Sequence, residues 1–308
     1  MMKNVFIDGS AGTTGLRIAE RLAARQDIQL LRVPEEYRKD PAARKGAMNQ
    51  ADIVFLCLPD DAAREAAGLI ENEKTAVIDT STAHRTADNW VYGFPEIGGL
   101  RDKIRAAKRI ANPGCHASGF IALIAPLVEA GLIASDEKLT CTSLTGYSGG
   151  GKKMIAEYEE EGRSPLLDAP RQYGLSQNHK HLPEMQKVCG LSKAPIFCPI
   201  VAPYYAGMEV TVPLFADAVK GGKEAIEAAY AEYYRSGLVR FVKDASENGF
   251  LSAGAYAGRD DMEITVSGNA ERILLVARFD NLGKGASGAA IQNMNLLLGA
   301  DEAAGLVV

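Results

Sequence analysis

KNVFIDGSAGTTG, residues 3–15, joins an apolar run to a glycine-rich turn and decides the fold class. KNVFID is typical of a buried strand, and a helical pattern opens at Leu16, directly after the glycines. Gly9 and Gly12 permit a tight turn that brings backbone N–H groups to a pyrophosphate at the positive end of the helix, and Gly15 permits close helix–strand packing. The stretch predicts a dinucleotide-binding loop, with a plain turn between strand and helix as the alternative. The expected loop contacts are Gly9, Ser10, Ala11, Gly12, Thr13, Thr14 and Gly15.

The same alternation of apolar runs and amphipathic stretches continues through roughly the first 115 residues. Apolar strands separated by helical segments indicate a parallel sheet covered by helices on both faces. The sequence therefore predicts an α/β fold whose first domain, residues 1–114, is a Rossmann-like doubly wound sheet with ligands at the carboxyl ends of its strands. The runs are KNVFID, TGLRIAERLAA, IQLLRV, ADIVFLCLP, DAAREAAGLI, AVIDT and KRIAN.

The second half has the pattern of an α+β domain. An apolar helix, FIALIAPLVEAG, ends at Gly131, and alternating strand patterns then surround one amphipathic helix, GKEAIEAAYAEYYRSG. We expect a mostly antiparallel sheet in a catalytic and oligomerisation domain, residues 115–284, and a closing helix, residues 285–308, that packs back on the first domain. Strands such as MEVTVPLF and RILLVARF leave more sheet surface than one helix can bury, so a homodimer or homotetramer is expected.

Composition excludes several classes of protein. The 308 residues are 47% hydrophobic and 24% charged with a net charge of -5, which argues against disorder and against nucleic-acid binding. Apolar runs fall far short of a membrane span, and the sequence opens in a strand without a signal-peptide core, so we expect a cytoplasmic protein with no membrane association. The five cysteines and four histidines show no disulfide or zinc spacing, so reduced thiols and no bound metal are expected.

Charges after the second predicted strand bear on the choice of dinucleotide. NADP enzymes place positive charge near the ribose 2′-phosphate, whereas NAD enzymes place an acid there. Arg32, Arg38 and Lys39 favour NADP, with Arg38 and Lys39 as expected contacts of the phosphate. Glu35 and Glu36 stand between these cations, so a solvated loop of mixed charge is the alternative.

The strongest candidate nucleophile is Cys115, in the segment NPGCHASG that follows a short strand and precedes the apolar helix. In the first turn of a helix, unpaired N–H groups and the helix dipole favour thiolate over thiol and lower the cysteine pKa. Apolar or strand-like segments surround the remaining cysteines, which are expected to be small core residues. They are Cys57, Cys141, Cys189 and Cys198.

A thiolate that attacks a carbonyl needs a proton donor for the oxygen that becomes negative, and NHKHLPE, residues 178–184, offers two histidines. The alternation predicts His179 and His181 on one side of an extended segment, with Glu184 at a helix start where its carboxylate orients one of them. We expect His181 to be the acid/base because it is nearer Glu184. A metal site at this pair is the alternative, and His116 is expected to be a packing residue.

Three further segments suggest anion binding: TGYSGGGKK, residues 145–153; STAHR, residues 81–85; and DNLGKGASG, residues 280–288. In the last, a helix cap is an equal alternative to a backbone approach to the cofactor. Expected substrate contacts are Arg85, Asn112, Ser148, Gly149 and Lys152, and further cofactor contacts are Ser81, Asn281 and Gly283.

Together, GSAGTTG, DTSTAHR, NPGC, TGYSGGGKK, NHKHLPE and DNLGKGASGAA resemble the shorter form of the N-acetyl-gamma-glutamyl-phosphate reductase family along the whole chain. The resemblance implies an NADP-dependent oxidoreductase of arginine biosynthesis, with a catalytic domain of the glyceraldehyde-3-phosphate dehydrogenase-like type. It places the family's nucleophile on Cys115 and its HxHxPE pattern on His179, His181 and Glu184. The longer form of the family has extra segments between the nucleotide fold and the cysteine, and this chain lacks them.

The implied reaction is reduction of N-acetyl-gamma-glutamyl phosphate to N-acetylglutamate 5-semialdehyde through a cysteine thioester, with release of phosphate. An aspartate-semialdehyde dehydrogenase-like acyl-phosphate reductase is one alternative, and HKHLPE and the short chain weigh against it. A protein that senses NADP without catalysis is another, and it has no need of a helix-start cysteine with paired histidines.

Overall fold

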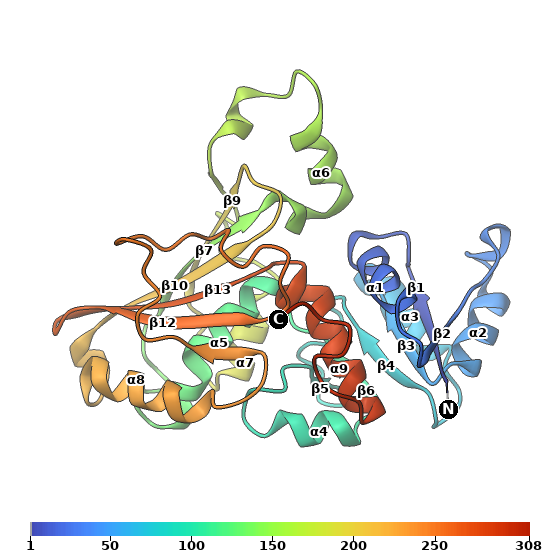
Figure 1. Ribbon diagram of the computed structural model, residues 1–308, viewed down its shortest axis with the longest axis horizontal. Helices are drawn as coiled ribbons and strands as arrows, with labels where there is room; N and C mark the ends of the chain where they lie inside the picture. The colour runs from blue at the N-terminus through green and yellow to red at the C-terminus, as the bar shows by residue number, and fades with distance from the viewer. Residues whose placement is uncertain (1) are drawn as a thin grey trace. The chain divides into compact units, whose positions relative to one another are not determined.

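The computed structural model describes residues 2–308, which divide into two compact units (Figure 1). Unit 1 runs up to Pro95 and includes Gly99–Pro113 and Ala286–Leu306. Unit 2 comprises Glu96–Gly98, Gly114–Gly285 and Val307–Val308. In the described part of the chain, no helix combines the length and the apolar character needed to cross a membrane.

Unit 1 is a parallel sheet of six strands in the order β2-β1-β3-β4-β6-β5. Helices α1, α4 and α9 supply apolar side chains to the core on one face, and α2 and α3 supply them on the other. This is the doubly wound Rossmann-like sheet that the sequence predicts. The elements are β1 (Lys3–Asp8), α1 (Thr13–Ala23), β2 (Ile28–Leu31), α2 (Pro41–Gln50), β3 (Ile53–Leu56), α3 (Asp60–Gly68), β4 (Ala76–Asp79), β5 (Val91–Tyr92), α4 (Leu100–Ala106), β6 (Arg109–Ala111) and α9 (Gly288–Leu298).

The position of β1 fixes where a ligand can bind to unit 1. Because β1 lies between β2 and β3, the chain leaves β1 toward one side of the sheet and later returns on the other. At such a switch point the loops after neighbouring strands separate, and ligands bind outside the carboxyl ends of the strands. The glycine-rich loop follows β1 at this place.

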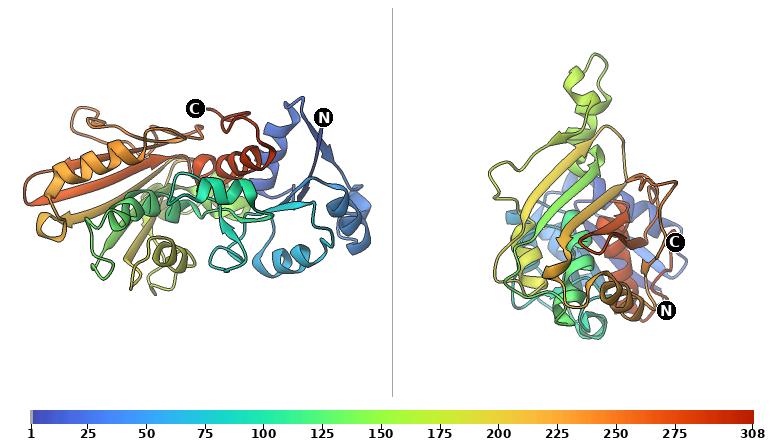
Figure 2. Two further views of the ribbon diagram at one scale, coloured as in Figure 1. Left: turned by 90° about the horizontal axis from the view of Figure 1, so that it is seen from below. Right: turned by 90° about the vertical axis from the view of Figure 1, so that its left-hand side faces the viewer.

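Unit 2 is a mixed sheet of seven strands in the order β11-β12-β13-β10-β7-β9-β8. Most pairs are antiparallel, as predicted, but β7–β9 and β11–β12 are parallel. Helix α5 packs on β10 and β13, and α8 packs on β12 and on α5. The segment that carries α6 extends beyond the sheet (Figures 1 and 2). The elements are α5 (Cys115–Glu129), β7 (Thr140–Gly146), α6 (Gly151–Glu159), β8 (Arg171–Gln172), α7 (Leu182–Val188), β9 (Ile196–Ala202), β10 (Met208–Phe215), α8 (Gly222–Tyr233), β11 (Val239–Phe241), β12 (Met262–Gly268) and β13 (Arg272–Phe279).

Helix starts are where the structure differs most from the sequence expectations. Helix α1 begins at Thr13, three residues before the expected Leu16, with Gly12 as its N-cap. Helix α6 begins at Gly151, inside the stretch expected to be an anion-binding loop. The closing helix, expected over residues 285–308, is shorter, because a π-helical turn precedes Gly288 and Gly299 ends the helix in a left-handed conformation. Where glycines cluster, the helix boundaries could not be predicted correctly from the sequence.

Candidate active site

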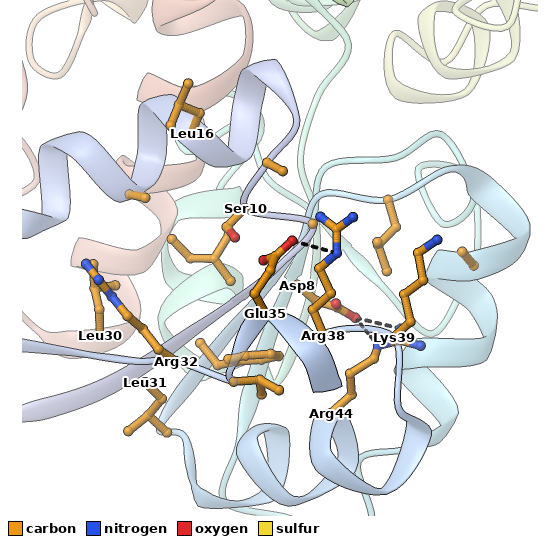
Figure 3. Close-up of a pocket in the computed structure, with 18 residues that line it drawn as sticks. Asp8, Ser10, Leu16, Leu30, Leu31, Arg32, Glu35, Arg38, Lys39 and Arg44 are labelled. Atoms are coloured by element: carbon orange, nitrogen blue, oxygen red, sulfur yellow. Dashed lines mark hydrogen bonds and ion pairs between the residues drawn. The ribbon is translucent and has the colours of Figure 1, made fainter.

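A cavity of about 620 Å³ lies in unit 1, at the carboxyl ends of β1 and β2 (Figure 3). The glycine-rich loop forms one wall through Gly9, Ser10 and Ala11. Apolar side chains and four basic residues form the others: Phe6, Ile7, Leu16, Ala19, Leu30, Leu31, Val33, Leu58 and Ala62, with Arg32, Arg38, Lys39 and Arg44. An apolar cavity beside a glycine loop and basic side chains fits the adenosine and phosphate groups of a dinucleotide.

The loop has the backbone that the sequence predicts for a pyrophosphate site. Gly9 has φ of +86°, and a Cβ there would lie 2.2 Å from the carbonyl oxygen of Cys57. A Cβ on Gly15 would lie 2.5 Å from the carbonyl oxygen of Gly9. Larger residues are therefore excluded at both positions, which leaves the loop close to the helix start, where N–H groups bind phosphates.

The charges of the cavity favour an anion. Four cations, Arg32, Arg38, Lys39 and Arg44, line it against two carboxylates, Asp8 and Glu35, an excess of two positive charges. Nε of Arg38 lies 3.0 Å from Glu35, but both side chains are exposed, so this pair is weak and the guanidinium can turn to a phosphate (Figure 3).

Sequence reasoning missed a buried ion pair in the cavity. Arg44 donates to Asp8 at 2.7 Å, and Asp8 is only 6% exposed (Figure 3). Arg44 lies on α2, 36 residues from Asp8 in the chain. No local pattern joins the two residues, although an acidic residue at the end of the first strand is itself a signal that a cation covers it.

A second polar group in unit 1 surrounds the end of β4. The buried Asp79 carboxylate accepts hydrogen bonds from the Ser81 hydroxyl and from His84, each at 2.7 Å. Arg85 donates through Nε to the Asn112 carbonyl at 2.9 Å and so joins the ends of β4 and β6. These side chains lie at the ligand-binding edge of the sheet, but Ser81 already uses its hydroxyl within the protein.

The Asn112 side chain also has partners within unit 1. Its Nδ2 donates to the Ala286 carbonyl at 3.0 Å, and its Oδ1 accepts from Asn293 at 3.2 Å. The amide therefore fixes the segment just before Cys115 to the start of α9.

Cys115 is the first residue of α5, with Gly114 as the N-cap. The Gly114 N–H donates to the Glu184 carboxylate at 3.1 Å, so the HKHLPE motif holds the turn that presents the cysteine. A second turn, Gly283–Ser287, packs closely on the cysteine, because a Cβ on Gly285 would lie 2.9 Å from the Cys115 Cβ. Lys284 anchors this second turn, because its ammonium forms a fully buried ion pair with Glu96 at 2.8 Å.

His179 and His181 lie together, with ring centroids 4.7 Å apart, although the segment is a turn and not the extended chain that was expected. His181 is the N-cap of α7, and its N–H donates to His179 Nδ1 at 3.2 Å. Glu184 lies in the first turn of α7, with Oε1 3.9 Å from His181 Nε2. In the described residues, no three His, Cys, Asp or Glu side chains are grouped to hold a metal ion.

His116 packs against both histidines, a contact that sequence reasoning missed. Its ring centroid lies 5.8 Å from that of His179 and 5.5 Å from that of His181. Burial, helped by His179, lowers the pKa of His116 to about 3, so the ring is neutral at pH 7 and is a weak base. Cys115 thus has a neighbour on each side, Gly114 and His116, that contacts the HKHLPE motif.

Buried thiols elsewhere behave as small core side chains. Burial raises the pKa of Cys57 to about 12 and also raises the pKa of Cys141 and of Cys189. These thiols are protonated at neutral pH and are poor nucleophiles.

Three of the remaining expected ligands in unit 2, Ser148, Asn281 and Gly283, have structural partners. Asn281 donates to the Ser148 hydroxyl at 3.0 Å and accepts from the Gly207 N–H at 3.0 Å. The Asp280 carboxylate accepts from the Gly283 N–H at 3.0 Å, a contact within the turn before α9. The N-cap of α9 itself is Ser287, which makes no side-chain cap hydrogen bond. Gly149 and Lys152 are exposed.

The comparisons with known proteins agree with this architecture. The family model "Semialdehyde dehydrogenase, NAD binding domain" matches residues 4–107, and "Semialdehyde dehydrogenase, dimerisation domain" matches residues 115–281. The chain is similar in fold to aspartate semialdehyde dehydrogenase II of Vibrio cholerae, at a TM-score of 0.70 and 18% identity over 97% of this chain and 98% of that one. The Candida albicans aspartate semialdehyde dehydrogenase solved with NADP gives a TM-score of 0.68 at 16% identity over 97% and 99%.

Curated relatives are much closer in sequence. The N-acetyl-gamma-glutamyl-phosphate reductase of Sinorhizobium fredii is 45% identical over 97% of this chain and 100% of its own length. That of Chelativorans sp. is 47% identical over 97% and 99%, and the Nostoc sp. protein named N-acetyl-gamma-glutamyl-phosphate reductase 2 is 44% identical over 98% of each. These relatives confirm the resemblance found in the sequence. The chain therefore belongs to the N-acetyl-gamma-glutamyl-phosphate reductase family, oxidoreductases with the semialdehyde dehydrogenase fold.

Proposed function

We propose that this chain reduces N-acetyl-gamma-glutamyl phosphate to N-acetylglutamate 5-semialdehyde, with NADPH as the hydride donor and Cys115 as the nucleophile. The observation that carries the proposal is the placement of Cys115 at the start of α5, where Gly114 on one side and His116 on the other contact the HKHLPE motif. The relatives' shared name supports the substrate, and membership of a family of biosynthetic reductases supports arginine biosynthesis in the cytoplasm.

Cys115 begins the reaction as a thiolate, which the positive end of α5 favours. The sulfur attacks the acyl carbon, the bond from that carbon to the phosphate oxygen breaks, and phosphate leaves with the electron pair. The product of this step is a thioester on Cys115. A thioester accepts hydride far more readily than a carboxylate does, which is why a cysteine is used.

His181 handles the proton in the second half of the reaction. The glycine-rich loop, Arg38 and Lys39 would hold NADPH in the unit 1 cavity, and the bound cofactor would supply the hydride that the thioester carbon accepts. The imidazolium of His181, which the negative charge of Glu184 stabilises, gives a proton to the oxygen as it becomes negative. The resulting thiohemiacetal returns that proton to His181 as the C–S bond breaks, which releases the semialdehyde and the thiolate. His179, whose Nδ1 accepts the His181 N–H, holds this turn in place.

The substrate contacts expected from the sequence are part of the proposal. We propose that Arg85 holds the phosphoryl group, because its guanidinium lies at the ends of β4 and β6. Asn112, Ser148 and Gly149 would act through the backbone they position, and Lys152 through its exposed ammonium on α6. Ser81, Asn281 and Gly283 keep a proposed backbone role toward the cofactor.

The reverse reaction tests the substrate. N-acetylglutamate 5-semialdehyde, phosphate and NADP should together produce NADPH absorbance, and aspartate semialdehyde in the same assay should give little. Faster turnover of aspartate semialdehyde would favour the alternative reductase. Tight NADP binding without turnover of either aldehyde would favour the non-catalytic sensor.

A double variant, Arg38→Ala with Lys39→Ala, tests the preference for NADP. Loss of two cations near the 2′-phosphate should raise the KM for NADPH by roughly tenfold or more and leave the KM for NADH nearly unchanged. Steady-state kinetics with both cofactors measure this, and Arg64→Ala, a change on α3 outside the cavity lining, is the matched control. An unchanged KM for NADPH would remove both residues from the cofactor site.

We also propose that the face of the seven-stranded sheet opposite α5 joins two copies of the chain. Phe215, Ile196 and Leu274 are 69%, 60% and 42% exposed on that face, whereas Val210 faces α5 on the other. A self-complementary sheet contact about a two-fold axis buries such a face, and the matched dimerisation model supports it.

Light scattering should give a mass of twice or four times 32.9 kDa. Phe215→Arg should lower that mass, and Tyr37→Arg, a change at another exposed aromatic residue, is the control. A wild-type mass near 32.9 kDa would contradict it.

A further inference from the structure

A hydrogen-bonded chain of three side chains lies beside the catalytic cysteine in unit 2. His116 follows Cys115 in α5, and its Nδ1 lies 2.7 Å from the Ser143 hydroxyl on β7. Its Nε2 lies 2.7 Å from the hydroxyl of Tyr173, which follows β8. His116 is 3% exposed and Ser143 is fully buried, so the hydrogen bond between them is shielded from water.

Burial decides the direction of these hydrogen bonds. A neutral imidazole donates from one nitrogen and accepts at the other, and His116 is neutral because desolvation lowers its pKa to about 3. Among the described residues, the His116 ring is the partner of the Ser143 hydroxyl. A buried hydroxyl proton without an acceptor is costly, which favours the tautomer in which Ser143 donates to Nδ1 and the Nε2–H donates to Tyr173.

That direction leaves the Tyr173 proton for another acceptor. Burial, and after it the charge of Cys115, raise the pKa of Tyr173, so the phenol stays protonated at neutral pH. Geometry places Tyr173 in the group of side chains around Cys115, because its hydroxyl contacts the ring of the next residue, His116, and its ring centroid lies 5.7 Å from that of His179. Hydrogen bonds to an ionised acceptor are roughly twice as strong as bonds between neutral groups, so a thiolate is a favoured acceptor for this proton.

We propose that Tyr173 donates a hydrogen bond to the Cys115 thiolate, and that His116 and Ser143 are positioning residues that fix the direction of that bond. This inference rests on the proposed role of Cys115 as the nucleophile. The bond stabilises the thiolate before it attacks the acyl phosphate and again when the C–S bond of the thiohemiacetal breaks. No proton is transferred in this role.

Other titratable groups also surround Cys115 and must be held constant in any test. His179 and His181 precede α7, Glu184 lies within it, and Lys284, paired with Glu96, lies in the turn that packs on Cys115. None of them is altered in the variants below. A shift between variants therefore reports on Tyr173 and its two positioning residues.

The test measures how alkylation of Cys115 by iodoacetamide depends on pH, and the rate of the reverse reaction. Tyr173→Phe should move the midpoint of the alkylation profile up by roughly one to two pH units and lower kcat/KM at pH 7 by roughly tenfold or more. Raising the pH should restore the activity, which it would not do if the change were only structural. Tyr204→Phe is the matched control, because the buried Tyr204 hydroxyl has no hydrogen-bond partner in the described structure.

Variants of His116 test the positioning role. His116→Leu should resemble Tyr173→Phe, and the double variant should be no worse than either single variant, because both changes remove the same bond. His116→Gln, which keeps an N–H donor in place of Nε2, should retain most of the activity. Thermal melting checks that each variant folds.

Two results would overturn the proposal. One is an alkylation midpoint in folded Tyr173→Phe that equals that of the wild type, and the other is multiplicative losses in the double variant. The alkylation profile needs no substrate, so it decides the role of Tyr173 even if the wild type fails to turn over N-acetylglutamate 5-semialdehyde. That failure would instead count against the proposed function.

Discussion

Replacing Cys115 by serine is expected to lower turnover by roughly 10⁴-fold or more, the largest loss of any single change in this protein. A serine hydroxyl stays protonated at neutral pH, and the oxygen ester it would form accepts hydride less readily than a thioester. Cys115 is not among the residues that line the cofactor cavity, so the affinity for NADPH should not change. Steady-state assays measure the loss, and calorimetry measures NADPH binding.

Cys198→Ser is the matched control for this change. Cys198 is a half-buried cysteine of unit 2, as Cys115 is, but it lies within strand β9 and not at a helix start. Its replacement should leave turnover within a fewfold of the wild type. A Cys115→Ala protein with near-normal activity would remove Cys115 from the mechanism.

Replacing His181 by asparagine is expected to lower kcat by the roughly 10²- to 10⁴-fold that a general acid/base contributes. His181 is 5% exposed, and its Nε2 lies 3.9 Å from the Glu184 carboxylate, which in the proposed mechanism stabilises the imidazolium that donates the proton. His179 is more exposed, and its Nδ1 accepts the His181 N–H, so its part is to hold the turn. His179→Asn should therefore cost less.

Glu184→Gln separates charge from position in the same motif. The amide oxygen can still accept the Gly114 N–H, so the turn before Cys115 should survive, while the negative charge near His181 is lost. We expect a loss smaller than that of His181→Asn. If His179→Asn costs more than His181→Asn, the two histidines exchange roles in the mechanism.

Features that depend on neighbouring residues could be predicted from the sequence. The strand–glycine–helix order of residues 3–23 predicts the loop and the doubly wound sheet, because both follow from local periodicity and from the space a glycine leaves. The start of α5 at Cys115 and the position of Glu184 at the start of α7 were predicted in the same way.

Contacts between distant segments could not be predicted in this way. Arg44 reaches Asp8 from α2, and Tyr173 reaches His116 across 57 residues, with no pattern in the sequence that links either pair. Helix α6 was not predicted, because its first residue, Gly151, follows two more glycines and glycine runs are typical of loops. Such contacts depend on tertiary packing, which the periodicity of a single sequence does not reveal.

Acylation of Cys115 tests the central claim most directly. The wild-type protein is mixed with N-acetyl-gamma-glutamyl phosphate without NADPH, quenched in acid and examined by mass spectrometry with peptide mapping. We predict one N-acetylglutamyl group in thioester linkage, located on Cys115, which added NADPH discharges as N-acetylglutamate 5-semialdehyde. An acyl group on another residue, no acyl group at all, or a Cys115 thioester that NADPH leaves intact would contradict the account.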